Sequence, residues 1–158
     1  MPTLYISPTG SGSGDGSSAA NAATLEDLPQ LIAAAGPGGQ VLLLADQGAY
    51  TAPTGALAIV AGGTASAPVT IRGVDSAGNA MAATITGTRT EPFDPASPAG
   101  EEVFRLLGGA NNLRFRDLAL ENVGTAFRVG ADVQNLAIEH VEATNVSRFF
   151  DNMVSGAN

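Results

Sequence analysis

Apolar and polar side chains alternate along residues 113–122, and the alternation changes phase once. One side of the pattern carries Leu113, Phe115, Leu118, Leu120 and Asn122. The other side carries Arg114, Arg116, Ala119 and Glu121. A period of two predicts β-structure, and a phase change inside such a pattern indicates a sharp bend. The pattern therefore predicts two short strands that meet at a corner at Asp117.

The same pattern recurs 23 residues later, with its phase change at His140. Its inward positions are Leu136, Ile138, Val141, Ala143 and Asn145, and its outward positions are Ala137, Glu139, Glu142 and Thr144. Phe104 recurs as Phe127, and a third unit begins at Phe150. A fixed period of this length is typical of a solenoid, in which each unit buries its apolar face against the next.

One helix is expected near the N-terminus, between a first strand and a long series of strands. A β-branched pattern over 3–8 predicts the first strand, and a helical pattern covers 27–36. Thr24 and Asp27 have capping-box spacing, but Pro29 conflicts with a helix that begins there; with Asp27 as the N-cap, Pro29 falls in the first turn. After the helix only short strand patterns follow, which disfavours a doubly wound α/β fold.

Each 23-residue unit holds three strands and three turns, which predicts one turn of a three-sided coil. Successive turns of such a coil lie about 4.8 Å apart, so Phe104, Phe127 and Phe150 should form a column, and Asn145 should lie on Asn122. Stacked asparagines can pass amide hydrogen bonds between turns and satisfy backbone groups at the corners. Leucine-rich repeats share the period, and "LALENV" is a loose match, but their convex helix is missing. That fold remains the alternative.

Two stretches resemble the right-handed parallel β-helix of the pectin-lyase-like superfamily: "LYISPTGSGSGDGSSAANAATLEDLPQLIAAAGPGGQVLLLADQGAY", and "APVTIRG" further on. The resemblance implies an all-β fold, a right-handed three-sided parallel β-helix (solenoid) formed by one domain over 1–158. The helix over 27–36 would cap its N-terminal end, and residues 40–158 would form the coils. Pro29 departs from the helix pattern of the family. The resemblance also implies an extracellular or cell-surface protein.

The C-terminal end of the expected solenoid is open. Asn158 falls at the position of Asn112 and Asn135, immediately before an expected strand. A solenoid needs a terminal cap for solubility, and none is visible in the sequence. We therefore expect an N-terminal fragment of a longer protein, an end that associates with another molecule such as a second copy, or both.

Composition excludes several classes of function. The formal net charge is −8, and all seven cationic side chains are arginine, which argues against nucleic acids and anionic membranes as partners. The absence of cysteine excludes disulfides and thiol chemistry. No three acids converge in the repeat alignment, so no metal or cofactor is expected; the resemblance makes calcium possible only in a full-length protein.

The repeat alignment brings charged residues of neighbouring turns together. Arg116 is expected beside Glu139, Arg128 beside Asp151, and Asp117 beside His140. Ion pairing on a solvated face explains all three pairs. An alternative interpretation makes Asp117 and His140 an acid/base pair, since a carboxylate can orient a histidine base.

Further candidates concern carbohydrate chemistry. A glycosidase needs two carboxylates across its substrate, and Glu121, Glu139 and Glu142 are the outward candidates. Arg116 and Glu121 are candidate substrate-binding residues. Phe93, in the proline-stiffened loop 87–102, could stack on a sugar ring, or the loop could be a surface bulge.

Three classes of function follow. The first is the N-terminal part of a secreted polysaccharide-binding or polysaccharide-cleaving protein of lyase or hydrolase type, whose catalytic machinery would lie mostly downstream. The second is a non-enzymatic structural or adhesive surface solenoid. The third is a self-associating module that stacks end to end through its open C-terminal end.

Overall fold

The computed structural model describes residues 2–88 and 101–153. The described chain is mostly β-structure, with one parallel sheet and one short α-helix. The helix α1 covers Leu28–Ala35, and 3-10 turns cover Ala19–Asn21, Leu25–Asp27 and Ala45–Gln47. The strands are β1 (Thr3–Ile6), β2 (Gln40–Leu44), β3 (Tyr50–Thr51), β4 (Leu57–Ile59), β5 (Val69–Val74), β6 (Ala83–Thr86), β7 (Glu102–Leu106), β8 (Leu113–Val129) and β9 (Leu136–Asn152). The prediction of an all-β fold with parallel strands is thereby confirmed.

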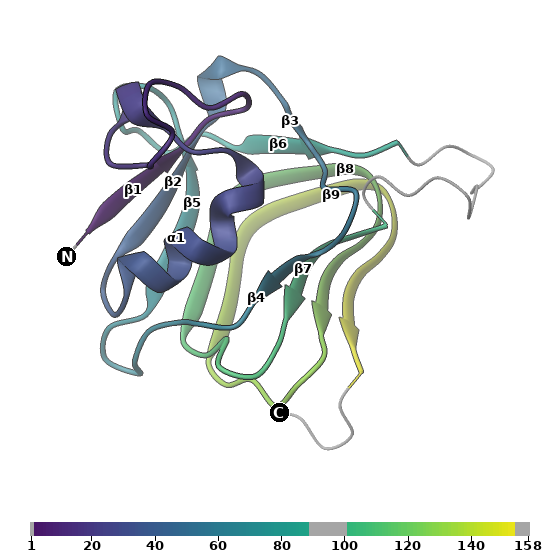
Figure 1. Cartoon of the computed structure of the whole chain (residues 1–158). Helices are drawn as coiled ribbons and strands as arrows, with labels where there is room; N and C mark the ends of the chain where they lie inside the picture. The colour runs from purple at the N-terminus through teal and green to yellow at the C-terminus, as the bar shows by residue number, and fades with distance from the viewer. Residues whose placement is uncertain (1, 89–100, 154–158) are drawn as a thin grey trace.

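Strand β8 pairs with three different strands that precede it in the chain (Figure 1). Residues 113–116 pair with β5, residues 118–121 with β6, and the segment that begins at Thr125 with β7. Strand β9 then follows β8 along its whole length, and paired residues are 23 positions apart, as in Leu113 and Leu136. The repeat period therefore equals the length of chain between paired positions.

The predicted corners are residues in the left-handed backbone region. Asp117 has φ 53° and His140 has φ 50°, and the same region holds Asn122 and Asn145 at a second corner. Asparagine and aspartate tolerate this conformation better than other non-glycine residues. Because one such residue turns the chain without ending the strand, β8 and β9 each run continuously through their corners, whereas the sequence pattern predicted three separate short strands in each unit.

Asparagine side chains bond to one another in two places, at a corner within β8 and β9 and immediately before the two strands. The Nδ2 of Asn145 donates to Oδ1 of Asn122 at 3.0 Å, and the Nδ2 of Asn135 donates to Oδ1 of Asn112 at 3.0 Å. These bonds confirm the predicted stacking of Asn145 on Asn122.

Phenylalanine rings form the centre of the core. Phe104, Phe115 and Phe127 are fully buried, and the Phe104 and Phe127 rings stack with centroids 5.0 Å apart. Phe150 pairs with Phe127 in the sheet register, as predicted. However, Phe150 is 47% exposed, and the Phe127 ring instead meets the Phe149 ring at 5.6 Å. The column is therefore confirmed in backbone register but only partly in ring packing.

The helix begins through both of the capping arrangements considered from the sequence. The Asp27 carboxylate accepts hydrogen bonds from the Thr24 backbone N–H (3.1 Å) and hydroxyl (3.0 Å), which fixes the preceding 3-10 turn. Asp27 is then the N-cap of α1, and Pro29 lies in its first turn, where no intrahelical donor is needed. Gly36, at φ 64°, ends the helix. The observed helix is one residue shorter at each end than the predicted 27–36.

The apolar side of α1 packs against β1, β2 and β4, at the N-terminal part of the sheet. The buried helix residues are Leu28, Leu31, Ile32 and Ala35. Strand β1 ends at Ile6, two residues before the predicted end, because the N–H of Ser7 donates to the carbonyl of Ala23 instead of continuing the pairing with β2. Nearby, the buried Tyr50 hydroxyl lies 2.9 Å from the Ile6 carbonyl oxygen and 3.0 Å from that of Leu44.

Candidate functional site

The outward side chains of β5 and of residues 113–116 form a surface rich in arginine. Arg72 pairs with Arg116, and Arg116 pairs with Glu139 on β9. The Nε of Arg116 lies 3.0 Å from Oε2 of Glu139, which confirms that these two predicted neighbours meet. We call the surface formed by Arg72, Arg114, Arg116 and Glu139 the arginine face.

The predicted pair at the first corner, Asp117 and His140, is adjacent but does not form a hydrogen bond. The Nδ1 of His140 lies 3.6 Å from Oδ1 of Asp117, which is longer than a hydrogen bond. The His140 side chain is 73% exposed, whereas the Asp117 side chain is only 15% exposed, so water competes mainly for the imidazole. The geometry fits a weak surface contact, and the acid/base interpretation stays a prediction.

The candidate carboxylates are divided between two surfaces. Glu121 lies in a row with Thr86 and Thr144, and Glu142 lies beside Ala119. Glu139 precedes the corner at His140 and belongs to the arginine face. We call the surface formed by Thr51, Thr84, Thr86, Glu121 and Thr144 the threonine face. Phe93, the proposed sugar-stacking residue, lies outside the described residues.

A third outward surface carries a continuous row of ion pairs, called here the ion-pair row. The Arg105 Nε donates to Glu102 Oε2 at 2.8 Å, and Arg128 contacts the other oxygen of Glu102. Arg128 and Arg148 both reach Oδ2 of Asp151 at 3.2 Å. The Arg128–Asp151 pair is as predicted, but Glu102 is a residue that the sequence interpretation missed, since it was assigned to the loop 87–102. The unbroken 23-residue spacing to Thr125 was the signal that could have placed it.

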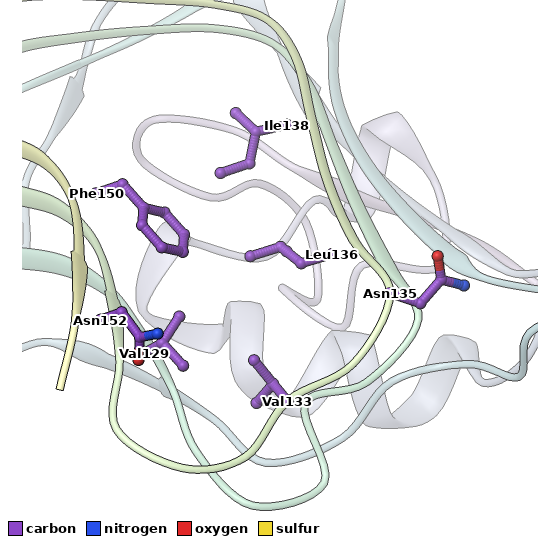
Figure 2. Close-up of a pocket in the computed structure, with 7 residues that line it drawn as sticks. All are labelled: Val129, Val133, Asn135, Leu136, Ile138, Phe150 and Asn152. Atoms are coloured by element: carbon purple, nitrogen blue, oxygen red, sulfur yellow. The ribbon is translucent and has the colours of Figure 1, made fainter. Parts of the chain in front are cut away.

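A hollow of about 390 Å³ lies at the β9 side of the molecule (Figure 2). Its lining is mainly apolar: Val129, Val133, Asn135, Leu136, Ile138, Phe150 and Asn152. Within the described residues β9 pairs only with β8, so one edge of β9 has no partner strand. We call this hollow and the free edge of β9 the end surface.

No protein-family model, curated protein or solved structure matches this chain. In the described part of the chain no three His, Cys, Asp or Glu side chains are grouped closely enough to hold a metal ion. No helix among residues 2–88 and 101–153 is long and apolar enough to cross a lipid bilayer.

Proposed function

We propose that the sheet closes into a right-handed three-sided β-helix that binds a polysaccharide along an outer surface. The observation that carries the fold is the pairing of β8 with three strands in turn. Contact across the interior supports closure, because the Phe115 ring lies 5.0 Å from that of Phe104 and 5.1 Å from that of Phe127. Those rings come from segments of the sheet that are separated by two corners.

Proton NMR tests the closure in solution. Nuclear Overhauser contacts are expected from the Phe115 ring protons to those of Phe104 and Phe127, since all three rings are in van der Waals range. Their absence in a folded sample would refute a closed cross-section. An experimental electron-density map would test the handedness of the coil. A left-handed coil would refute the proposed right-handed β-helix.

The threonine face supports polysaccharide binding. Thr51, Thr86, Glu121 and Thr144 are successive partners in the sheet register, so their side chains start about 4.8 Å apart along a straight line. Hydroxyl and carboxylate groups at a constant spacing suit a ligand that is itself a linear repeat of hydroxyl-bearing units. A polymer of this kind would be met outside the cell or at its surface.

Affinity electrophoresis through gels that contain defined polysaccharides tests the proposal. Migration of the wild-type chain should be retarded by at least one polymer, and Thr86→Val should lose most of that retardation because it removes a hydroxyl at nearly constant volume. Thr70→Val is the matched control, since Thr70 on β5 pairs with Arg114 and therefore lies on the arginine face. No retardation by any polymer, or loss in the control alone, would refute binding at the threonine face.

The same samples separate binding from cleavage. Lyase action would produce absorbing unsaturated ends, and hydrolase action would produce new reducing ends. Binding without either product would identify a binding surface alone, whereas either product would identify a cleaving enzyme and the bond that it breaks.

Self-association through the end surface is the second candidate function, favoured by the apolar hollow and the free edge of β9. We propose a second copy as the occupant, in a tail-to-tail arrangement. Because α1 already covers apolar side chains at the N-terminal strands, head-to-tail stacking would have to displace it. A two-fold arrangement needs only the two end surfaces.

Light scattering over a range of concentrations tests this second proposal. The wild-type chain should form a dimer, and Phe150→Asp should be monomeric because a carboxylate in the hollow would lose its hydration. Val60→Asp is the control, since Val60 is also exposed but lies outside the hollow. A wild-type chain that is monomeric at every concentration would refute the dimer.

A further inference from the structure

Two arginines of the arginine face are direct partners in the parallel sheet. Arg72 on β5 pairs with Arg116 on β8, so their side chains leave the same side of the sheet about 4.8 Å apart. Arg114 lies two residues before Arg116 and points to the same side. Like charges directly opposite one another destabilise a strand pair, so this arrangement needs a compensating negative charge.

Carboxylates of the described residues only partly neutralise the charge of these arginines. In the described residues neither Arg72 nor Arg114 makes an ion pair with a carboxylate. The Nε atoms of Arg72 and Arg116 are buried, and no hydrogen-bond acceptor meets them within residues 2–88 and 101–153. Glu139 lies close to the Arg116 Nε, but that contact does not have the direction of a hydrogen bond. The ion-pair row is different, because each of its three arginines reaches a carboxylate there.

Charge on this surface also contrasts with the rest of the molecule. Arg72, Arg114, Arg116 and Glu139 together carry a net charge of +2, from three cations and one anion, on a chain whose formal net charge is −8. Asp117, at the adjoining corner, faces His140 and lowers the positive charge nearby without pairing with Arg72. A compact anion interacts mainly with the arginines next to it, because salt screens more distant charges, whereas an extended polyanion such as nucleic acid would also lie against the acidic remainder of the surface.

We propose that the arginine face binds a tetrahedral oxyanion of the sulfate class between Arg72 and Arg116, either as the free ion or as a sulfate ester on a saccharide. A guanidinium offers N–H donors in a planar fork that matches oxyanion oxygens. One planar carboxylate is satisfied by a single fork. The oxygens of a tetrahedral anion point in several directions and can accept from two guanidinium groups on neighbouring strands at once. This site is separate from the threonine face and does not depend on polysaccharide binding there.

Two-dimensional NMR of the arginine Nε–H groups reports on the site directly. Addition of sodium sulfate, at an ionic strength held constant with sodium chloride, should move the Arg72 and Arg116 Nε–H signals along saturable curves. The Arg148 signal should not move, because Arg148 lies in the ion-pair row. Arg72→Gln should weaken sulfate binding about tenfold or more, as measured on the Arg116 signal, since it removes charge-assisted hydrogen bonds. Arg148→Gln should leave the binding curve unchanged.

Two further ligands distinguish the source and the shape of the anion. A monosaccharide sulfate ester that produces the same shifts would identify an ester-borne group as a ligand, whereas shifts with inorganic sulfate alone would identify the free ion. Sodium acetate should produce much weaker shifts. The proposal is overturned if sulfate moves neither signal, if acetate binds equally well, or if Arg72→Gln binds sulfate like the wild type. A folded Arg72→Gln chain is verified by an unchanged circular dichroism spectrum.

Discussion

Replacement of Asn122 tests how the corners hold the structure together. Asn122 has φ 55°, and its Oδ1 accepts the hydrogen bond from Asn145. Asn122→Ala removes the hydrogen-bond acceptor and places an alanine in the left-handed backbone region. The left-handed conformation costs an alanine about 1–2 kcal/mol, and the lost hydrogen bond costs about 0.5–1.5 kcal/mol. The free energy of unfolding should therefore fall by about 1.5–3.5 kcal/mol.

Asn122→Gly separates the two contributions. Glycine adopts the left-handed region without steric cost, so this variant loses the hydrogen bond but avoids the backbone strain. Its greater freedom in the unfolded chain offsets about 0.5–1 kcal/mol of that advantage. The glycine variant should remain more stable than the alanine variant by about 0.75 kcal/mol, which is the difference between the midpoints of the two ranges.

Urea unfolding followed by far-ultraviolet circular dichroism measures both variants, since the chain has no tryptophan to report by fluorescence. Equal stabilities of the alanine and glycine variants would refute the role assigned to the backbone conformation. A glycine variant as stable as the wild type would refute the role assigned to the hydrogen bond between Asn122 and Asn145.

Two further predictions concern the core. Phe115→Ala should lower the free energy of unfolding by about 3–5 kcal/mol, because it removes a fully buried ring. Phe150→Ala should lower it much less, because that ring is half exposed. Equal losses of stability in urea unfolding would contradict the described packing. Burial raises the pKa of Tyr50 above its ordinary value. Because the folded state keeps the Tyr50 phenol neutral, its contribution to the free energy of unfolding is fully present below the unfolded pKa of about 10. That contribution is lost as pH rises beyond this value, since only the unfolded chain then ionises. Urea unfolding of the wild type should therefore show a steeper loss of stability above about pH 10 than that of Tyr50→Phe. A parallel pH dependence of the two proteins would contradict the assignment of this loss to Tyr50.

The sequence predicts the corners well because their cause is local. A residue in the left-handed region reverses the side to which the following side chains point, so Asp117 and His140 appear as phase changes in the alternation. The same locality explains the stacking of Asn145 on Asn122 and the meeting of Arg116 with Glu139. These contacts join residues one period apart, and the period is visible in the sequence.

Contacts between residues that are not 23 positions apart are harder to predict. Glu102 joins Arg105 on its own strand and Arg128 on the next, so its role depends on side-chain reach and not on spacing alone. Arg72 makes no ion pair with a carboxylate in the described part of the chain, and this too is hidden in the sequence, because spacing does not say which carboxylates fail to reach an arginine. The candidate carbohydrate residues Glu121 and Arg116 are on different surfaces for a reason that was visible, since the corner at Asp117 lies between them.

Identical residue types in identical register do not guarantee the same environment. Phe127 and Phe150 are partners in the sheet, yet Phe127 is fully buried and Phe150 is 47% exposed. Along β8 most inward side chains are buried, whereas along β9 the corresponding side chains are partly or largely exposed. The difference arises because burial of an inward ring requires a neighbouring strand on both sides, and β9 has one within the described residues. A repeat in the sequence therefore specifies which residues face inward, while the number of adjacent layers decides which of them form core and which form an apolar surface available to a partner.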